Sequence, residues 1–77
     1  MRLTYDPRHD IGYVRLRPHT AHVETVRVAA DLNVDLAPDG TVHGIELLHA
    51  NEQLRGDGGL LVVVNEALGE ERELGLY

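Results

Sequence analysis

The fold is decided by residues 32–48, which read LNVDLAPDGTVHGIELL. The first five residues alternate leucine or valine with asparagine or aspartate, which is the two-residue period of a strand with one apolar face. The tetrapeptide Ala37-Pro38-Asp39-Gly40 then places proline at the second position of a turn and glycine at the last. This stretch therefore predicts a β-hairpin, and the rest of the sequence is interpreted outward from it.

The return strand of this hairpin is predicted over residues 41–48. Because side chains of a strand point alternately to its two faces, its residues divide into two sets. We expect one face to carry His43, Ile45 and Leu47, and the other to carry Val42, Gly44 and Glu46.

Three further strands are predicted before the hairpin, over residues 1–5, 11–17 and 23–28, each with alternating polar and apolar side chains. In the second, Val14 and Leu16 should point to one face and the polar side chains to the other. In the third, we expect Val26 and Val28 to point inward and Thr25 and Arg27 to point outward.

The chain after the hairpin has a different pattern. Residues 49–55 contain good helix formers and predict one or two helical turns, and the glycines of 56–59 interrupt the chain. Residues 60–64, LLVVV, favour a strand because three adjacent residues are β-branched. We expect this strand either to complete the sheet or to pair with a second subunit. The pattern of residues 66–77 is compatible with a short helix or with an extended tail.

These patterns predict one domain, residues 1–77, of the α+β class and predominantly β. The expected architecture is an antiparallel meander of about five strands with a short helical segment and a C-terminal strand. A chain of 77 residues buries only about 60% of its unfolded surface and is marginally stable alone. Because it has no cysteine, neither a disulfide nor a thiolate metal site can stabilise it. We therefore expect a homodimer or a higher homo-oligomer.

The charge of the chain is unevenly distributed. Its 13 acidic and 7 basic residues give a net charge of −6, and the excess of acidic residues lies after residue 37. An acidic surface repels phosphate backbones and anionic lipids, so we expect no nucleic-acid and no membrane partner. The N-terminal segment has no pattern of a secretion signal, and the longest apolar run is 60–64. These features predict a cytoplasmic protein.

Two blocks of sequence resemble a bacterial family, domain of unknown function 2283. The first runs from Leu3-Thr4-Tyr5-Asp6 to Tyr13-Val14-Arg15-Leu16, and the second from Asn33-Val34-Asp35 through Asp39-Gly40 to 42–50, VHGIELLHA. The resemblance covers about residues 1–50, which leaves 51–77 as a C-terminal extension. It implies a compact β-rich domain of a prokaryote, with no catalytic residue and no cofactor to carry over. The family is also loosely associated with small partners of toxin-like proteins.

The sequence lacks serine, cysteine and lysine. This composition excludes serine and cysteine nucleophiles, Schiff-base chemistry and a phosphate-binding loop lysine. Asp6 and Asp10 flank a turn, and bonding within that turn is the preferred interpretation of both carboxylates. His19 and His22 have a spacing seen in some metal sites, but no third ligand follows at a diagnostic interval. We predict no metal site and keep these two histidines as weak candidates.

The remaining ligand-binding candidates are Arg15, Arg17, Arg27 and Tyr13. Their arginines should project from neighbouring strands on one face, where they could hold an anionic ligand or a partner's carboxylates. Cross-strand ion pairing with acidic residues of the same face is the alternative.

The preferred function is a non-catalytic protein-interaction module that self-associates. One alternative is an antitoxin-like partner that covers a basic toxin with its acidic C-terminal surface. The other is a small metal- or ligand-binding enzyme built on His19, His22 and the carboxylates.

Overall fold

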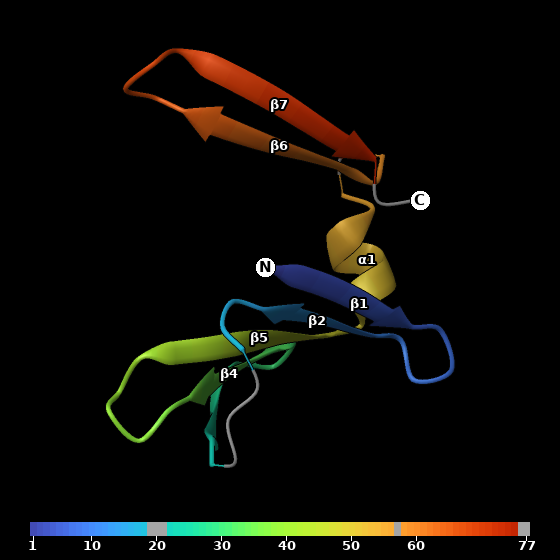
Figure 1. Ribbon diagram of the computed structural model, residues 1–77. Helices are drawn as coiled ribbons and strands as arrows, with labels where there is room; N and C mark the ends of the chain where they lie inside the picture. Colours follow the sequence, from blue (N-terminus) through green and yellow to red (C-terminus); the bar gives the residue numbers. More distant parts are fainter. Residues whose placement is uncertain (19–21, 57, 76–77) are drawn as a thin grey trace.

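The protein was analysed as a computed structural model that describes residues 1–18, 22–56 and 58–75 (Figure 1). Five strands form one antiparallel sheet, one short helix lies against it, and two strands form a separate hairpin. The elements in chain order are β1 (Arg2–Asp6), β2 (Ile11–Arg15), β3 (Glu24–Ala29), β4 (Leu32–Leu36), β5 (Val42–Leu48), α1 (Ala50–Leu54), β6 (Leu60–Asn65) and β7 (Glu70–Gly75). The predicted class, α+β and predominantly β, is confirmed.

The hairpin of residues 32–48 is present as β4 and β5. Its turn is closed by the backbone N–H of Gly40, which donates to the carbonyl of Ala37 at 2.9 Å, and Gly40 has the positive φ of 87° that this position requires. The side chain of Asp39 accepts hydrogen bonds from the amide and the hydroxyl of Thr41. These local bonds explain why the turn was evident from the sequence.

The strand order is β1-β2-β5-β4-β3, which departs from a simple meander. The chain leaves β2, which lies next to the edge strand β1, and continues as β3 at the opposite edge, and β5 later enters between β2 and β4. Strand periodicity carries no information on which strands are neighbours, and this order is set by tertiary packing. One consequence is that β2 and β3 are separated by two other strands.

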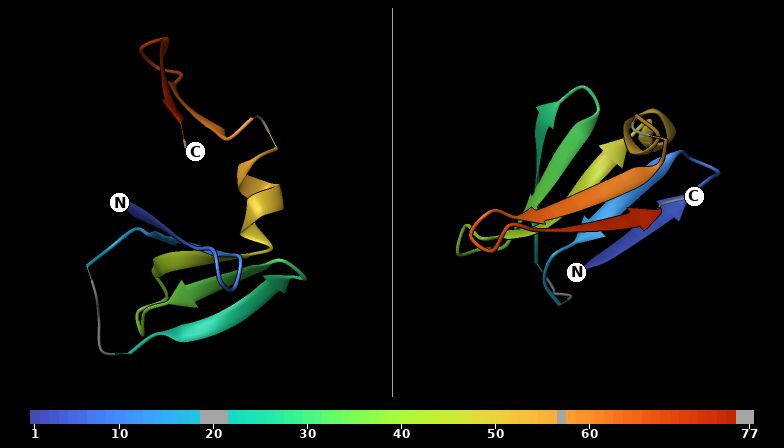
Figure 2. Two further views of the ribbon diagram at one scale, coloured as in Figure 1. Left: turned by 90° about the vertical axis from the view of Figure 1, so that its right-hand side faces the viewer. Right: turned by 90° about the horizontal axis from the view of Figure 1, so that it is seen from above.

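The cross-strand register gives the sheet two different sides. Gly12, Val14, Ile45 and Leu47 lie on the side covered by α1, which we call the helix side. The opposite side, the polar face, carries Arg2, Thr4, Tyr13, Arg15, Thr25, Arg27, Asn33, Asp35, Gly44 and Glu46. Figure 2 shows the helix on one side of the curved sheet only.

The predicted faces of the return strand are wrong at its beginning. Asp35 pairs with Gly44 but Leu36 pairs with Val42, so His43 is an extra residue in a β-bulge of β5. The bulge places His43 among residues of the polar face and Val42 on the helix side, whereas Ile45 and Leu47 keep their predicted side. His43 is only 5% exposed, so the residue in the bulge is buried.

The prediction that Val26 and Val28 point into a core is also wrong. Their exposed fractions are 39% and 62%, and every residue of β3 is exposed. The helix α1 packs against β2, and β3 is the edge strand farthest from β2. Alternation identified a strand with an apolar side, but no described element of the same chain covers that side.

The predicted helical segment is present as α1, and it is anchored by a residue distant in sequence. Asp10 lies in the β1–β2 turn with a φ of 55°, and its Oδ1 accepts a hydrogen bond of 2.8 Å from the amide of Asn51. Its backbone carbonyl accepts a second bond, from the amide of Ala50 at 2.9 Å. Asp10 therefore acts as an N-terminal cap on a helix whose own N-cap residue, His49, makes no capping hydrogen bond through its side chain.

Gly12 lets α1 approach the sheet closely. A Cβ at this position would lie 3.3 Å from the Cβ of Ala50, which is the fully buried hydrophobic residue of the described chain. The larger apolar residues around this contact keep part of their surface exposed. The core of one chain is therefore very small.

Replacing Asp10 tests the anchoring of α1. Asp10→Ala removes the carboxylate oxygen that accepts hydrogen bonds from the amide of Asn51 and from the hydroxyl of Tyr5. It also places an alanine, whose methyl group can form no hydrogen bond, at a backbone position with a positive φ. We expect it to lower the free energy of unfolding by about 1–2 kcal/mol. Asp10→Asn keeps an amide oxygen and tolerates this backbone conformation, so it should lose less. Urea denaturation at one protein concentration measures both, and equal losses would contradict the capping role.

The C-terminal strand neither joins the five-stranded sheet nor continues as a helix. β6 pairs with β7 in antiparallel register from Leu60 and Gly75 to Asn65 and Glu70, and Gly69 occupies the turn with a φ of 65°. Of the segment 66–77, for which a short helix and an extended tail were both compatible with the sequence, residues 66–69 form a turn and Glu70–Gly75 form β7. Figures 1 and 2 show this hairpin standing beyond α1, away from the sheet. Within the described chain, no helix has the length and apolar character needed to cross a membrane.

Candidate functional site

Two rows of polar side chains cross the polar face from edge to edge. Cross-strand partners in the first row are Arg2, Arg15, Gly44, Asp35 and Thr25. Cross-strand partners in the second row are Thr4, Tyr13, Glu46, Asn33 and Arg27. Each strand of the sheet contributes one residue to each row. The family-like part of the chain therefore presents a continuous polar surface that spans all five strands.

Hydrogen bonds hold part of this surface in a fixed arrangement. The hydroxyl of Tyr13 donates to Oδ2 of Asp35 at 2.8 Å, and the hydroxyl of Thr25 donates to Oδ1 of the same carboxylate at 2.6 Å. In the neighbouring row, the amide of Asn33 donates to Glu46 at 2.9 Å. The Tyr13 bond connects the two rows diagonally across β5.

Gly44 provides the space that this diagonal bond needs. A Cβ built at Gly44 would overlap the hydroxyl oxygen of Tyr13 and lie 2.9 Å from its Cε1. The ring of Tyr13 therefore lies over the glycine and reaches from β2 to Asp35 on β4. Any side chain at position 44 would displace the ring.

The same environment raises the pKa of Tyr13 to about 12, first because of its desolvation and then because of the hydrogen bond to Asp35. Because the pKa of this phenol is higher in the folded state, Tyr13 stays neutral in the folded protein at pH values at which the same phenol is ionised in the unfolded chain. The stabilisation is therefore complete below about pH 10 and is lost as the pH rises to about 12. Under ordinary conditions Tyr13 is a hydrogen-bond donor, and it is not a base.

A hollow of about 350 Å³ opens on the polar face around these groups. Residues near both edges of the sheet contribute to it. It is lined by Arg2, Thr4, Tyr13, Arg15, Val23, Asp35 and His43.

The four predicted ligand-binding residues do not form one cluster. Tyr13 and Arg15 line the hollow, while Arg17 lines a separate one beside it, which also includes Arg2 and Arg15. Arg27 lies on β3, separated from β2 by two strands, and its guanidinium donates to the carbonyl of Ala30 at 3.0 Å. The predicted grouping of three arginines on neighbouring strands is therefore wrong, because β4 and β5 lie between β2 and β3.

Sequence reasoning did not identify Arg2, Thr4 and His43 as site residues. A signal for the first two was present, because the predicted strands 1–5 and 11–17 are consecutive and pair as a hairpin, in which Arg2 lies opposite Arg15 and Thr4 opposite Tyr13. No comparable signal existed for His43, because it reaches the hollow through the bulge in β5. The site is thus formed by residues from the N-terminal hairpin and from the central strand.

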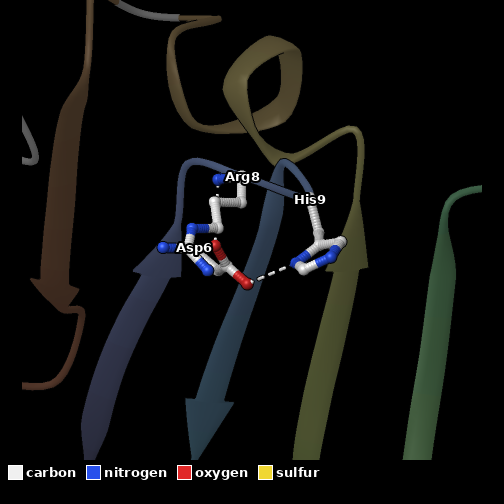
Figure 3. Close-up of polar contacts among 3 residues, drawn as sticks. All are labelled: Asp6, Arg8 and His9. Carbon is white, nitrogen blue, oxygen red and sulfur yellow. Dashed lines mark hydrogen bonds and ion pairs between the residues drawn. The ribbon is translucent and has the colours of Figure 1, made fainter.

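The histidine and carboxylate residues offer a second candidate, at the β1–β2 turn. Nδ1 of His9 lies 2.7 Å from Oδ2 of Asp6, and the backbone amide of Arg8 donates to Oδ1 at 2.9 Å (Figure 3). The hydrogen bond from His9, followed by that from Arg8, lowers the pKa of Asp6. Both side chains are exposed, at 68% for His9 and 48% for Asp6. This geometry agrees with the predicted turn-bonding role of Asp6.

The weak metal candidates are not brought into a site in the described structure. His22 is exposed and lines a shallow hollow with Glu24, and His19 lies outside the described residues. Over 1–18, 22–56 and 58–75, no group of three histidine or acidic side chains is placed to hold a metal ion.

The described chain also exposes many large apolar side chains. Large hydrophobic side chains with at least a third of their surface exposed occur on β1, β3 and β5 and along the whole apolar part of β6. On β6 the exposed fractions range from 36% at Leu61 to 51% at Val64. Both sides of this strand are apolar, since Leu60, Val62 and Val64 alternate with Leu61 and Val63. We call β6, together with the helix side of the sheet, the apolar surface.

Comparison with known protein families identifies the family of the chain. A family model described as "Protein of unknown function (DUF2283)" matches residues 2–51, about two thirds of the chain. This match confirms the resemblance seen in the sequence. The matched segment includes all five strands of the sheet and the start of α1, and it ends before β6. No curated protein and no solved structure matches the chain significantly.

Proposed function

We propose that this chain, which belongs to the DUF2283 family of proteins of unknown function, is a non-catalytic interaction module that self-associates through its apolar surface. The absence of serine, cysteine and lysine from the sequence supports the non-catalytic part of the proposal. The exposure of the apolar surface supports the second part. The occupant of that surface is a second copy of the same chain.

The exposed area of one chain is the observation that carries the proposal. The chain exposes 5869 Å². A folded monomer of 8.5 kDa exposes about 4,700 Å² on average, so this chain has an excess of about 1,200 Å². Each partner of a standard protein interface buries about 800 Å², and obligate dimers bury more. The excess is therefore of the size that each subunit of a stable dimer buries, which supports the proposal.

The dimensions of the chain agree with this comparison. Its radius of gyration is 13.8 Å, whereas a compact domain of 77 residues has one of about 11.5 Å. The difference arises because β6 and β7 stand apart from the sheet. An open arrangement of this kind is typical of a chain that completes its core with a partner.

The β6–β7 hairpin requires such cover for its own stability. An isolated two-stranded hairpin is at best marginally stable in water, and a strand that is apolar on both sides needs both sides covered. Its partner strand β7 is mainly acidic and polar and leaves the apolar side chains of β6 exposed. In a two-fold dimer each hairpin covers apolar surface of the other chain, so that the same surface serves both subunits.

The oligomeric state in solution tests this proposal. Sedimentation equilibrium or light scattering at protein concentrations of about 1–100 μM should give a mass of at least twice 8.5 kDa. Thermal unfolding should shift to higher temperature as the protein concentration rises, because association stabilises the folded chain. A strictly monomeric protein with a concentration-independent melting temperature would overturn the proposal.

A further inference from the structure

Two arginines face each other at one end of the hollow on the polar face. Arg2 of β1 and Arg15 of β2 are direct cross-strand partners, and both line the hollow. Like charges directly opposite each other destabilise an antiparallel strand pair. In the parts of the chain that the structure describes, neither guanidinium forms an ion pair with a carboxylate. The fold therefore places two arginines of like charge next to each other in the hollow.

The other end of the hollow has the opposite character. Asp35 lines it, and each of its two carboxylate oxygens already accepts a hydrogen bond, from Thr25 and from Tyr13. A second anionic group would be repelled there, whereas neutral hydroxyl or amide groups would find polar partners. His43 on β5, a residue that is 5% exposed, lies between the two ends, and Thr4 lies on β1 beside Arg2. The hollow is therefore electrostatically polarised along its length.

We propose that this hollow binds a small molecule that carries one oxyanion group, a phosphate or a carboxylate, between Arg2 and Arg15. Guanidinium groups bind both oxyanions through paired N–H donors, and two of them neutralise a charge of up to −2. The volume of about 350 Å³ lies in the range of small-ligand sites. The uncharged part of the ligand would extend toward Thr4 and Tyr13.

This proposal does not rest on self-association. The hollow lies on the polar face, and α1 lies on the other side of the sheet, with β6 and β7 beyond it. A ligand in the hollow and a second copy on the apolar surface would therefore occupy different sides of the sheet.

The test is an NMR titration of the full chain with inorganic phosphate and, separately, with acetate, both at constant ionic strength. We expect saturable shifts of the backbone amides around the hollow for at least one probe. Arg15→Gln should weaken binding at least tenfold, and Arg2→Gln should do the same. Arg8→Gln is the matched control, since it removes the same charge from the exposed β1–β2 turn and lines none of the described hollows.

Thermal unfolding gives a second readout that separates binding from folding. The probe that binds should raise the melting temperature of the wild type and of Arg8→Gln, but not that of Arg15→Gln. Without the probe, Arg15→Gln should melt at or above the wild-type temperature, because the repulsion from Arg2 is removed. Saturation by phosphate alone or by acetate alone would identify the oxyanion. Shifts that never saturate with either probe, or equal affinities of Arg15→Gln and Arg8→Gln, would overturn the proposal.

Discussion

Gly44→Ala is expected to destabilise the protein by about 3 kcal/mol, which corresponds to roughly 15 °C in melting temperature for a chain of this size. A Cβ at position 44 overlaps the hydroxyl oxygen of Tyr13 and lies 2.9 Å from Cε1 of its ring. The ring must move, and the hydrogen bond of 2.8 Å to Asp35 is then lost in a half-buried position. Differential scanning calorimetry at a fixed protein concentration measures the loss.

Two further variants show whether the effect passes through Tyr13. Gly56→Ala is the matched control, because its Cβ would meet only the carbonyl of Gln53, at the ordinary contact distance of 3.7 Å. In a Tyr13→Ala background the tyrosine ring is absent, so adding Gly44→Ala should lower the free energy of unfolding only slightly. The effects of the two substitutions on stability should therefore be strongly non-additive. A Gly44→Ala protein as stable as Gly56→Ala would show that the ring does not occupy this space.

Val62→Thr together with Val63→Thr is expected to raise the dissociation constant of the dimer about a thousandfold, since each hydroxyl buried without a partner costs about 1 kcal/mol and a dimer contains four of them. The two valines point to opposite sides of β6. Threonine preserves the β-branched shape, so the strand propensity is retained. Sedimentation equilibrium measures the change in association.

Val23→Thr is the matched control for this experiment. Val23 is 42% exposed, as is Val62, but it lines the hollow on the polar face and is not part of the apolar surface. We expect it to associate as the wild type does. Unchanged association of the Val62→Thr, Val63→Thr protein would mean that β6 is a solvated surface, and the proposed interface would then be wrong.

The sequence predicted most of the local structure, and the reason lies in short-range chemistry. The alternation of residues 32–36 and the turn Pro38-Asp39-Gly40 specify a hairpin through bonds between residues near one another in the chain. The bonding of Asp6 and Asp10 in the β1–β2 turn followed from the same kind of reasoning. Asp10 nevertheless has a second role at the start of α1, across 41 positions of sequence, which no local pattern indicates.

The candidate site was predictable only in part. Tyr13 and Arg15 were identified because they are polar residues on one face of an alternating strand, and they do line the hollow. Arg27 was grouped with them because β2 and β3 are consecutive, yet the sheet places two strands between them. The single-residue bulge at His43 reversed the expected sides of two residues, since one inserted residue changes the phase of a two-residue period.

The sequence by itself determined where the strands before residue 66, their turns and the helical segment occur, and it determined which chemistries the chain lacks, because backbone propensity and side-chain type are properties of single residues and their near neighbours. Only the tertiary structure decided that β5 lies between β2 and β4, that Tyr13 reaches Asp35 over Gly44, and that β6 pairs with β7 away from the sheet. These features depend on how much apolar area each arrangement removes from water, and that quantity exists only once the strands are placed against one another.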